Sequence, residues 1–359
     1  MRTISRIIAA GLPALLRLLP PKSDGPRILL IHQLLVGDGI LVWPLLHRLE
    51  HEMRVAIACP LPLIALYQKF FPGFSYFAFS ERDPSSVIKL LWTARKCDQV
   101  ICPIESRLHR YALALRPNMI IGYGRDTGHT APAGLLPFPT ERMTFSDMMN
   151  RLVRPSSNRF NPPLNISLSH ERRCIIHVDA RNPNRRWKHD KWRELATRLR
   201  QCGFKILWCG GTASSGDIET LLEPGEEPLS PTNLLTYLAA IQSAALLVCP
   251  DTGIAHLAKL TSTPTIVIYG QGNPALHGNG EYWSNARTLN IFQEQIPCRD
   301  KDTVMGFKVD WLRRCDRTPS ECQNPFCQND ISVQDIIESA RLRFPELFLK
   351  PPPTPQQST

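Results

Sequence analysis

The sequence predicts an α/β protein built from two doubly wound units, each a parallel sheet with helices on both faces. Solidly apolar runs of strand length recur along the chain, and each is followed by a polar or glycine-containing loop and then a helical pattern. Parallel strands with helical crossovers are buried on both faces, so their runs need not alternate with polar residues. The chain of 359 residues, 43% of them hydrophobic, is long enough for two cores.

The first unit is expected over residues 27–160. A buried strand over residues 27–33 follows Pro26, and an apolar helix follows the loop at 34–40. Further predicted elements are strands at 55–59, 99–104 and 119–123 and helices at 61–70 and 85–96. Asp38 stands between Gly37 and Gly39 on the first loop, where open α/β sheets bind ligands. The local alternative is a turn aspartate that bonds its own backbone.

The second unit is expected over residues 170–330. Its first strand, 173–178, leads into a loop that carries Arg181, Arg185, Arg186 and Lys188. Such side chains can hold a diphosphate through charge-assisted hydrogen bonds, or they can form a solvated basic loop. A strand at 204–209 then ends in the glycine turn Gly210-Gly211, and a helix is predicted at 233–243.

The most informative stretch is Val248-Cys-Pro-Asp-Thr-Gly-Ile-Ala-His256. A buried strand at 244–249 ends at Pro250, and Asp251 or Thr252 is placed to cap the next helix. Gly253 lets a ligand approach the backbone, and free N–H groups at a helix start suit a diphosphate. A second buried strand follows at 265–269. The alternative for Asp-Thr-Gly taken by itself is an ordinary helix cap.

This stretch resembles the donor-site signature of the glycosyltransferase family 9 heptosyltransferases. In that family a strand ends in Asp-Thr-Gly, a histidine follows three residues later, as His256 does here, and a Thr-Pro-Thr strand comes next, matched by residues 263–265. The resemblance covers roughly residues 27–345. It implies the GT-B architecture, in which two Rossmann-like domains face each other across a cleft.

The resemblance also assigns roles to residues. Asp38 matches the catalytic base, and Arg185 stands, two residues before Trp187, where the family usually has a donor-phosphate lysine. The implied donor-binding residues are Arg185, Asp251, Thr252, Gly253 and His256, and the implied loop contacts are Gly37, Trp187, Gly210 and Asn273. Two places depart from the family pattern. Its Ser-rich run before the glycine is Gln33-Leu-Leu-Val36 here, and Thr212-Ala-Ser-Ser215 stands just beyond Gly211, where the family often has an acidic residue.

Composition limits the partners. The net charge of +10 favours anionic partners, but no nucleic-acid-binding signature is present, so nucleic acid is not expected. Residues 1–19 pattern as a basic amphipathic helix suited to an anionic membrane surface. The alternatives for this segment are packing on the protein itself or a signal peptide. Residues 20–26 pattern as a linker, 331–345 as a closing helix and 346–359 as a disordered tail.

The chain has eleven cysteines, an odd count that favours a reducing, cytoplasmic setting. Attachment to the periphery of the inner membrane is an option that the pattern of residues 1–19 leaves open. Cys298, Cys315, Cys322 and Cys327 gather in one segment, but no pair has the CxxC spacing typical of zinc sites. The resemblance implies a reaction without a metal ion or other cofactor. We therefore expect none.

The expected function is inverting transfer of a sugar, heptose by resemblance, from a nucleotide-sugar such as ADP-heptose to lipopolysaccharide core or another glycolipid. Two alternatives stand beside it. One is a catalytically silent relative that binds a nucleotide or glycan, suggested by the altered run 33–36. The other is a nucleotide-sugar epimerase of the same architecture.

Overall fold

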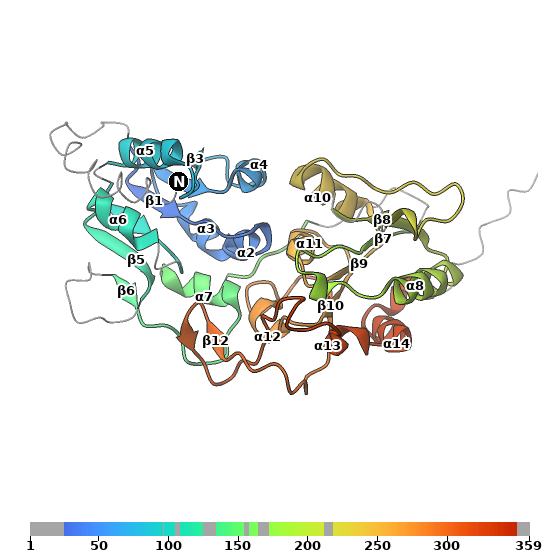
Figure 1. Ribbon diagram of the computed structural model, residues 1–359. Coiled ribbons are helices and arrows are strands. Elements are labelled where there is room, and N and C mark those ends of the chain that lie inside the picture. Colours follow the sequence, from blue (N-terminus) through green and yellow to red (C-terminus); the bar gives the residue numbers. More distant parts are fainter. Residues whose placement is uncertain are drawn as a thin grey trace, which may run out of the picture.

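The computed structural model describes residues 25–95, 97–104, 108–124, 134–153, 158–163, 172–211 and 218–349. Two parallel sheets with their helices form two halves that lie side by side (Figure 1). The fold class is therefore confirmed. The segments predicted as a membrane-surface helix (1–19) and as most of the disordered tail (350–359), and much of the loop after Tyr123, lie outside the described residues.

The first sheet has the strand order β3-β2-β1-β4-β5-β6, with every pair parallel. Its strands are β1 (Ile28–Ile31), β2 (Val55–Cys59), β3 (Ser75–Ala78), β4 (Gln99–Ile101), β5 (Met119–Tyr123) and β6 (Leu135–Leu136). The helices of this half are α2 (Val36–Leu41), α3 (Trp43–Leu49), α4 (Leu61–Phe70), α5 (Pro84–Thr93), α6 (His109–Leu115) and α7 (Phe145–Leu152). The order reverses between β1 and β4, which makes this edge of the sheet the expected ligand site.

The second sheet has the order β11-β10-β9-β7-β8, again all parallel. Its strands are β7 (Arg173–His177), β8 (Lys205–Cys209), β9 (Leu246–Pro250), β10 (Thr265–Tyr269) and β11 (Thr288–Phe292). The helices beside it are η2 (Pro183–Arg185), α8 (His189–Gln201), α10 (Leu234–Ser243), α11 (Gly253–Ala258), α12 (Pro274–His277), α13 (Phe326–Asn329), α14 (Val333–Arg343) and η4 (Pro345–Leu347). Here the order reverses between β7 and β9.

Several helix starts follow the chemistry of their sequence. Ser332 caps α14 by accepting a hydrogen bond from Asp335 N. Asn233 and Thr236 form a reciprocal capping box at α10. Thr252 is the N-cap residue of α11, yet its side chain makes no cap bond, so that helix start is left uncapped by side chains. Helix α11 is short: it ends at Ala258, and Leu260 lies beyond its end.

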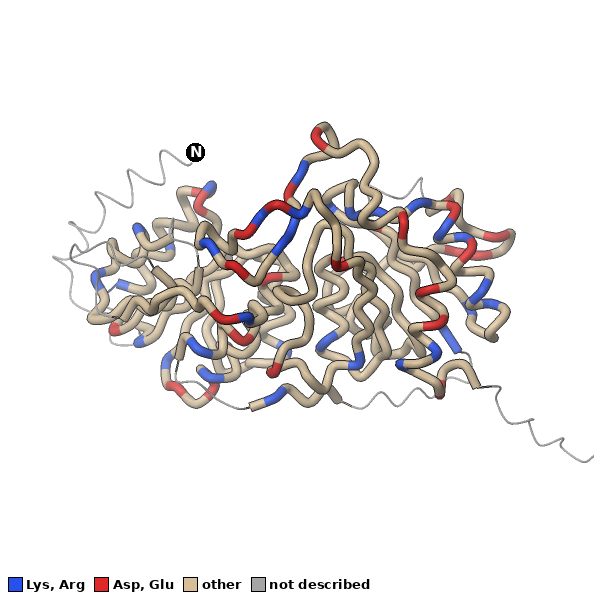
Figure 2. The backbone as a smooth tube through the Cα atoms, turned by 90° about the horizontal axis from the view of Figure 1, so that it is seen from below, with Lys and Arg blue, Asp and Glu red and all other residues tan. Residues whose placement is uncertain are grey.

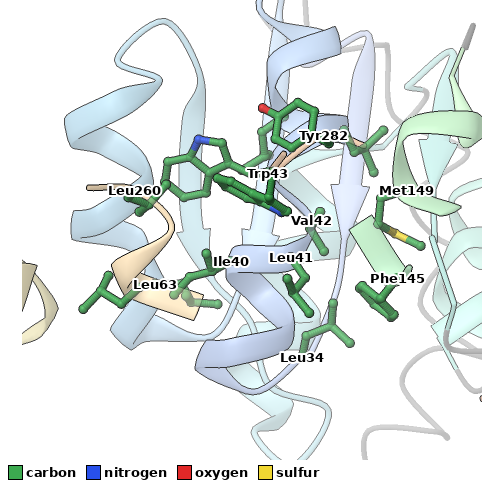
Figure 3. Close-up of a cluster of buried hydrophobic side chains, with 14 of the residues drawn as sticks. Leu34, Ile40, Leu41, Val42, Trp43, Leu63, Phe145, Met149, Leu260 and Tyr282 are labelled. Atoms are coloured by element: carbon green, nitrogen blue, oxygen red, sulfur yellow. The ribbon is translucent and has the colours of Figure 1, made fainter. Parts of the chain in front are cut away.

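The two halves share one continuous apolar core. A single cluster of buried side chains runs from β1, α2 and α3 of the first half into α11, β10 and the 282–286 segment of the second. Figure 3 shows Leu260 and Tyr282 of the second half beside Trp43 and Leu63 of the first. Two further clusters cover the outer faces of the two sheets. The inner helices α2 and α11 therefore pack directly on each other.

The segment after β11 extends under the first half. The hairpin of β12 (Thr303–Val304) and β13 (Phe307–Lys308) lies beside α7 in Figure 1, and Phe307 stacks on Phe138 with ring centroids 4.4 Å apart. Charged residues of both signs are spread over both halves (Figure 2). No described helix is both long enough and apolar enough to cross a membrane.

Candidate active site at the junction of the two sheets

Asp38 and the predicted donor residues meet where the two sheets face each other. Asp38 lies in the first turn of α2, directly after β1, while Arg185 follows β7 and Asp251 follows β9. Each of these strands borders the point where its sheet reverses order. Because ligands of open α/β sheets bind at such points, the side chains of both halves that lie there form the candidate site.

Asp38 interacts electrostatically with three groups of the second half. Burial raises the pKa of the Asp38 carboxyl above its ordinary value, and the negative charge of Asp251 raises it further. Interactions with His277 and Arg185 act in the opposite direction. A carboxylate made more basic by burial is suited to accept a proton near neutral pH.

Two glycines bring the helix starts of α2 and α11 together. A Cβ atom added to Gly37 would lie 2.9 Å from His256 Cδ2 and 3.1 Å from Gly253 Cα. A Cβ atom added to Gly253 would lie 3.3 Å from Gly37 N. The backbones approach so closely that neither position has room for a side chain without movement. Gly37, predicted as a loop contact, is thus a point of contact between the halves.

Asp251 is held in place before any ligand is bound. Its side chain is buried, and Arg185 Nη1 donates to Asp251 O at 3.2 Å and lies 3.5 Å from Asp251 Oδ2. The carboxylate also rests against Gly272, where an added Cβ would lie 2.0 Å from Oδ2. Next to it, the buried Thr252 Oγ1 has no hydrogen-bond partner within the described residues. That hydroxyl is available to a ligand.

Two buried histidines stand beside these groups. His256 and His277 have ring centroids 6.1 Å apart, and their Nδ1 atoms lack hydrogen-bond partners among the residues described. Burial lowers the pKa of both imidazoles, so both are neutral near pH 7. Neutral imidazoles offer one donor and one acceptor, which suits sugar hydroxyls.

Lys259, a buried lysine that the sequence analysis does not single out, lies beside these two histidines. Lys259 Nζ donates to His277 O at 2.9 Å and to Gly278 O at 2.6 Å. Burial lowers the pKa of Lys259 to about 7. The signal in the sequence is a lysine three residues after His256, between the apolar residues Ala258 and Leu260.

Two buried glutamines, which sequence reasoning also missed, hold the loops around Arg185. Gln271 Oε1 accepts from Asn182 Nδ2 at 2.7 Å, and Gln271 Nε2 donates to Arg317 O at 2.7 Å. Gln328 Nε2 donates to Arg185 O at 2.6 Å. The donor-side loop is therefore fixed by residues that lie far along the chain.

The structure gives three further predicted contacts, Trp187, Asn273 and Gly210, the following surroundings. Trp187 is buried against Trp192, with ring centroids 5.0 Å apart, so its indole belongs to the core of the second half. Asn273 caps α12 and donates to Arg313 O at 2.8 Å. Gly210 follows β8, and the turn after Gly211, residues 212–217, lies outside the described residues.

Metal ligands do not gather in the described part of the chain. Within it, no group of three or more His, Cys, Asp or Glu side chains is arranged to hold a metal ion. The four late cysteines are free thiols: Cys315 and Cys327 are buried, and Cys298 and Cys322 are half-buried. Cys315 Sγ accepts from Arg317 N at 3.5 Å.

Comparison with known proteins agrees with this arrangement. Residues 154–308 match the family model described as "Glycosyltransferase family 9 (heptosyltransferase)". Lipopolysaccharide heptosyltransferase 1 of Pseudomonas aeruginosa is 30% identical over 95 residues, which are 26% of this chain and 27% of that protein. This alignment spans about a quarter of the curated relative's length.

Solved structures share the whole architecture. A family 9 glycosyl transferase from Veillonella parvula has a TM-score of 0.68 at 16% identity, covering 91% of this chain and 100% of that one. The ADP-heptose lipopolysaccharide heptosyltransferase II of Escherichia coli has a TM-score of 0.64 at 16% identity, covering 89% and 99%. These likenesses show that this chain has the GT-B fold. Residues 154–308 are in addition similar to glycosyltransferase family 9.

Proposed function

We propose that this chain is an inverting glycosyltransferase that moves a sugar from a nucleotide-sugar to an acceptor hydroxyl. The observation that carries the proposal is the meeting of Asp38, from the first half, with Arg185, Asp251 and His277, from the second. The similarity of residues 154–308 to the family model supports the same activity. The finer assignment, ADP-heptose as donor and lipopolysaccharide core or another glycolipid as acceptor, rests on the family and its named relatives.

In the proposed reaction Asp38 takes the proton of the acceptor hydroxyl as its oxygen attacks the anomeric carbon. The new carbon–oxygen bond forms as the bond from that carbon to the diphosphate oxygen breaks, which inverts the anomeric centre. Arg185, Thr252 Oγ1 and the first N–H groups of α11 receive the charge of the departing diphosphate. Asp251, His256 and His277 hold hydroxyls of the donor. No step in this account uses a metal ion.

Nucleotide binding and transfer are tested separately. Thermal shift with ADP, UDP, GDP and CDP reports donor-site binding, because a ligand that binds only the folded protein raises its melting temperature. Donor consumption and product analysis with and without acceptor then report the reaction. A chain that none of the four nucleotides stabilises would remove the proposal.

A binding protein without activity is the second candidate, favoured by the run Gln33-Leu-Leu-Val36 just before the base. Such a protein would bind the nucleotide-sugar and leave it intact with every acceptor offered. Conversion of the donor sugar without an acceptor, with the nucleotide still attached, would instead indicate an epimerase.

For the setting, we propose a cytoplasmic enzyme that works at an anionic membrane surface. The net charge of +10 and the pattern of residues 1–19 support it. Co-sedimentation of the full chain with anionic and with neutral vesicles tests it. Equal recovery with both would contradict it.

A further inference from the structure

Two buried polar side chains that the reaction above does not use contact the helix that carries Asp38. His32 directly follows β1, Tyr67 lies in α4, and both are buried, with 1% and 0% of their surface exposed. The Tyr67 hydroxyl donates to Gly39 O at 2.8 Å and lies 3.3 Å from His32 Nε2. Because Gly39 follows Asp38 in sequence, this pair reaches the turn from which the base projects.

Helix α2 is short and begins without a side-chain cap. It has six residues, and its N-cap residue makes no side-chain cap bond. Helices of this length are not stable alone, so contacts with the rest of the protein hold α2 in place. Ser146 Oγ donates to Leu41 O at the end of the helix. Tyr67 donates to Gly39 O, which is the nearer of these two carbonyls to the base.

The absence of a side chain at Gly39 lets α4 approach the backbone of α2. A Cβ atom added to Gly39 would lie 2.4 Å from Leu63 Cδ1 and 3.3 Å from the Tyr67 hydroxyl oxygen. Leu63 and Tyr67 are four residues apart and therefore lie on one face of α4. That face sets the position of the turn at Gly39, through one apolar contact and one hydrogen bond.

The hydrogen bonds around Tyr67 run in one direction. Burial raises the pKa of the Tyr67 phenol well above its ordinary value and lowers the pKa of His32 to about 3, so both side chains are neutral near pH 7. A neutral phenol has one proton, which Tyr67 gives to Gly39 O, so its oxygen accepts from His32 Nε2–H. The Nδ1 atom of His32 is then an acceptor, and it has no hydrogen-bond partner among the described residues.

We propose that His32 and Tyr67 are positioning residues for the base. The Nε2–H group of His32 fixes the rotation of the Tyr67 hydroxyl, and this hydroxyl fixes the Gly39 carbonyl and with it the direction in which Asp38 projects. The proposal rests on the transferase function above. Because a base must lie within hydrogen-bond reach of the proton that it accepts, a shift of α2 lowers the rate of transfer. Donor binding by the second half stays unchanged.

Tyr67→Phe removes the hydroxyl and keeps the ring. For transfer from ADP-heptose to lipopolysaccharide core, we expect kcat to fall by about 10- to 100-fold, since a misplacement of about 1 Å costs up to about 100-fold. KM for ADP-heptose and the rise in melting temperature with ADP should stay as in the parent. A side chain that only stabilises the fold would instead lower the melting temperature and leave kcat of the folded enzyme unaltered.

Tyr76→Phe is the matched control. The Tyr76 hydroxyl also donates to a backbone carbonyl of the first half, Phe71 O at 2.7 Å, but this carbonyl lies at the end of α4 and not in α2. Its removal should leave kcat at the parent value. If Tyr67→Phe and Tyr76→Phe have the same kcat, the positioning role is overturned.

Two substitutions of His32 test the other bond and decide the question even where Tyr67→Phe does not fold. His32→Gln keeps an N–H donor of similar reach, whereas His32→Leu has none. Transfer by His32→Gln should stay near that of the parent, and transfer by His32→Leu should fall. The double variant of His32→Leu and Tyr67→Phe should lose no more than Tyr67→Phe alone, because both act at one carbonyl. Losses that multiply, or equal kcat for the two His32 variants, would contradict the proposal.

The parent and Asp38→Asn, assayed beside these variants, keep the two proposals apart. If the parent transfers sugar, Asp38→Asn does not, and both Tyr67→Phe and His32→Leu transfer as the parent does, only the positioning role is overturned. If the parent transfers no sugar, the transferase function fails and the positioning role fails with it.

Discussion

The indole N–H of Trp283 donates to Ser146 Oγ over 2.8 Å across the junction between the two halves. Ser146 in turn donates to Leu41 O at 3.0 Å, the carbonyl at the end of α2. Because Asp38 lies in the first turn of the same six-residue helix, this chain of hydrogen bonds joins the second half to the helix that carries the base.

Ser146→Ala should therefore destabilise the junction. The substitution leaves the buried Trp283 N–H and Leu41 O without their partner, which costs about 1–3 kcal/mol. Chemical denaturation followed by tryptophan fluorescence measures the loss. Ser243→Ala is the matched control, since that hydroxyl is exposed and bonds only its own helix at Ala240 O. Equal effects of both substitutions would argue against a special role for Ser146.

Asp38→Asn should abolish most transfer while nucleotide binding survives. An amide of the same shape cannot accept the proton, and a positioned base contributes about 10²–10⁴-fold to rate. Steady-state transfer assays and nucleotide thermal shifts measure the two properties on one preparation. Asp190→Asn, an exposed aspartate in the first turn of α8, serves as control. Parent-like turnover by Asp38→Asn would remove Asp38 from the mechanism.

The pH dependence of kcat/KM should follow the pKa of Asp38, and two substitutions should shift its acid limb in opposite directions. Activity requires the ionised carboxylate, so kcat/KM should fall as pH drops through a pKa that burial raises above the ordinary aspartate value. Arg185→Gln removes a charge that lowers this pKa, so the acid limb should move to higher pH. Asp251→Asn removes a charge that raises it, so the limb should move to lower pH.

Lys188→Gln is the control for these profiles. It removes a positive charge from an exposed position near Arg185 in sequence, and Lys188 is not among the charges that act on Asp38. If the acid limb moves in the same direction in Arg185→Gln, Asp251→Asn and Lys188→Gln, the pKa of Asp38 does not determine the acid limb.

Gly37→Ala should force α2 away from α11. The new Cβ would stand 3.1 Å from a backbone atom, Gly253 Cα, which cannot rotate aside as a flexible side chain can. Overpacking of this kind costs about 1–3 kcal/mol. We expect a lower melting temperature and reduced transfer. Gly73→Ala is the control, because nothing lies within 4 Å of its added Cβ. An unchanged Gly37→Ala protein would show that the helices separate freely.

Lys259 should make stability rise with pH above neutrality. Its pKa is about 7 in the folded protein against 10.5 for the unperturbed group, so the unfolded chain binds the extra proton between these values. The contribution of Lys259 to stability therefore increases from about pH 7 to about 10.5 and is smallest below that range. The difference in melting temperature between the parent and Lys259→Met, followed against pH, isolates this term. A difference independent of pH would refute it.

The strands that the sequence predicts well are the solidly apolar ones, such as β1, β2, β9 and β10. The edge strands β3 and β11 were not predicted, because their residues are mostly half-exposed and form no continuous apolar run. A strand that is buried on both faces is a continuous apolar run and can be predicted from sequence. An edge strand has no such run, and its conformation depends on pairing with the neighbouring strand.

The sequence by itself determined the two sheets and the positions of Asp38, Arg185 and Asp251, because each follows a buried parallel strand and the carboxyl ends of such strands share one edge of the sheet. Only the tertiary structure decided that Trp187 belongs to the core, that Lys259 supports His277, and that both halves share one apolar cluster. These outcomes depend on partners far along the chain, as in the bond from Gln328 to Arg185 O. Buried polar groups are usually hydrogen-bonded, and the residues near them in sequence do not show which distant residue is the partner.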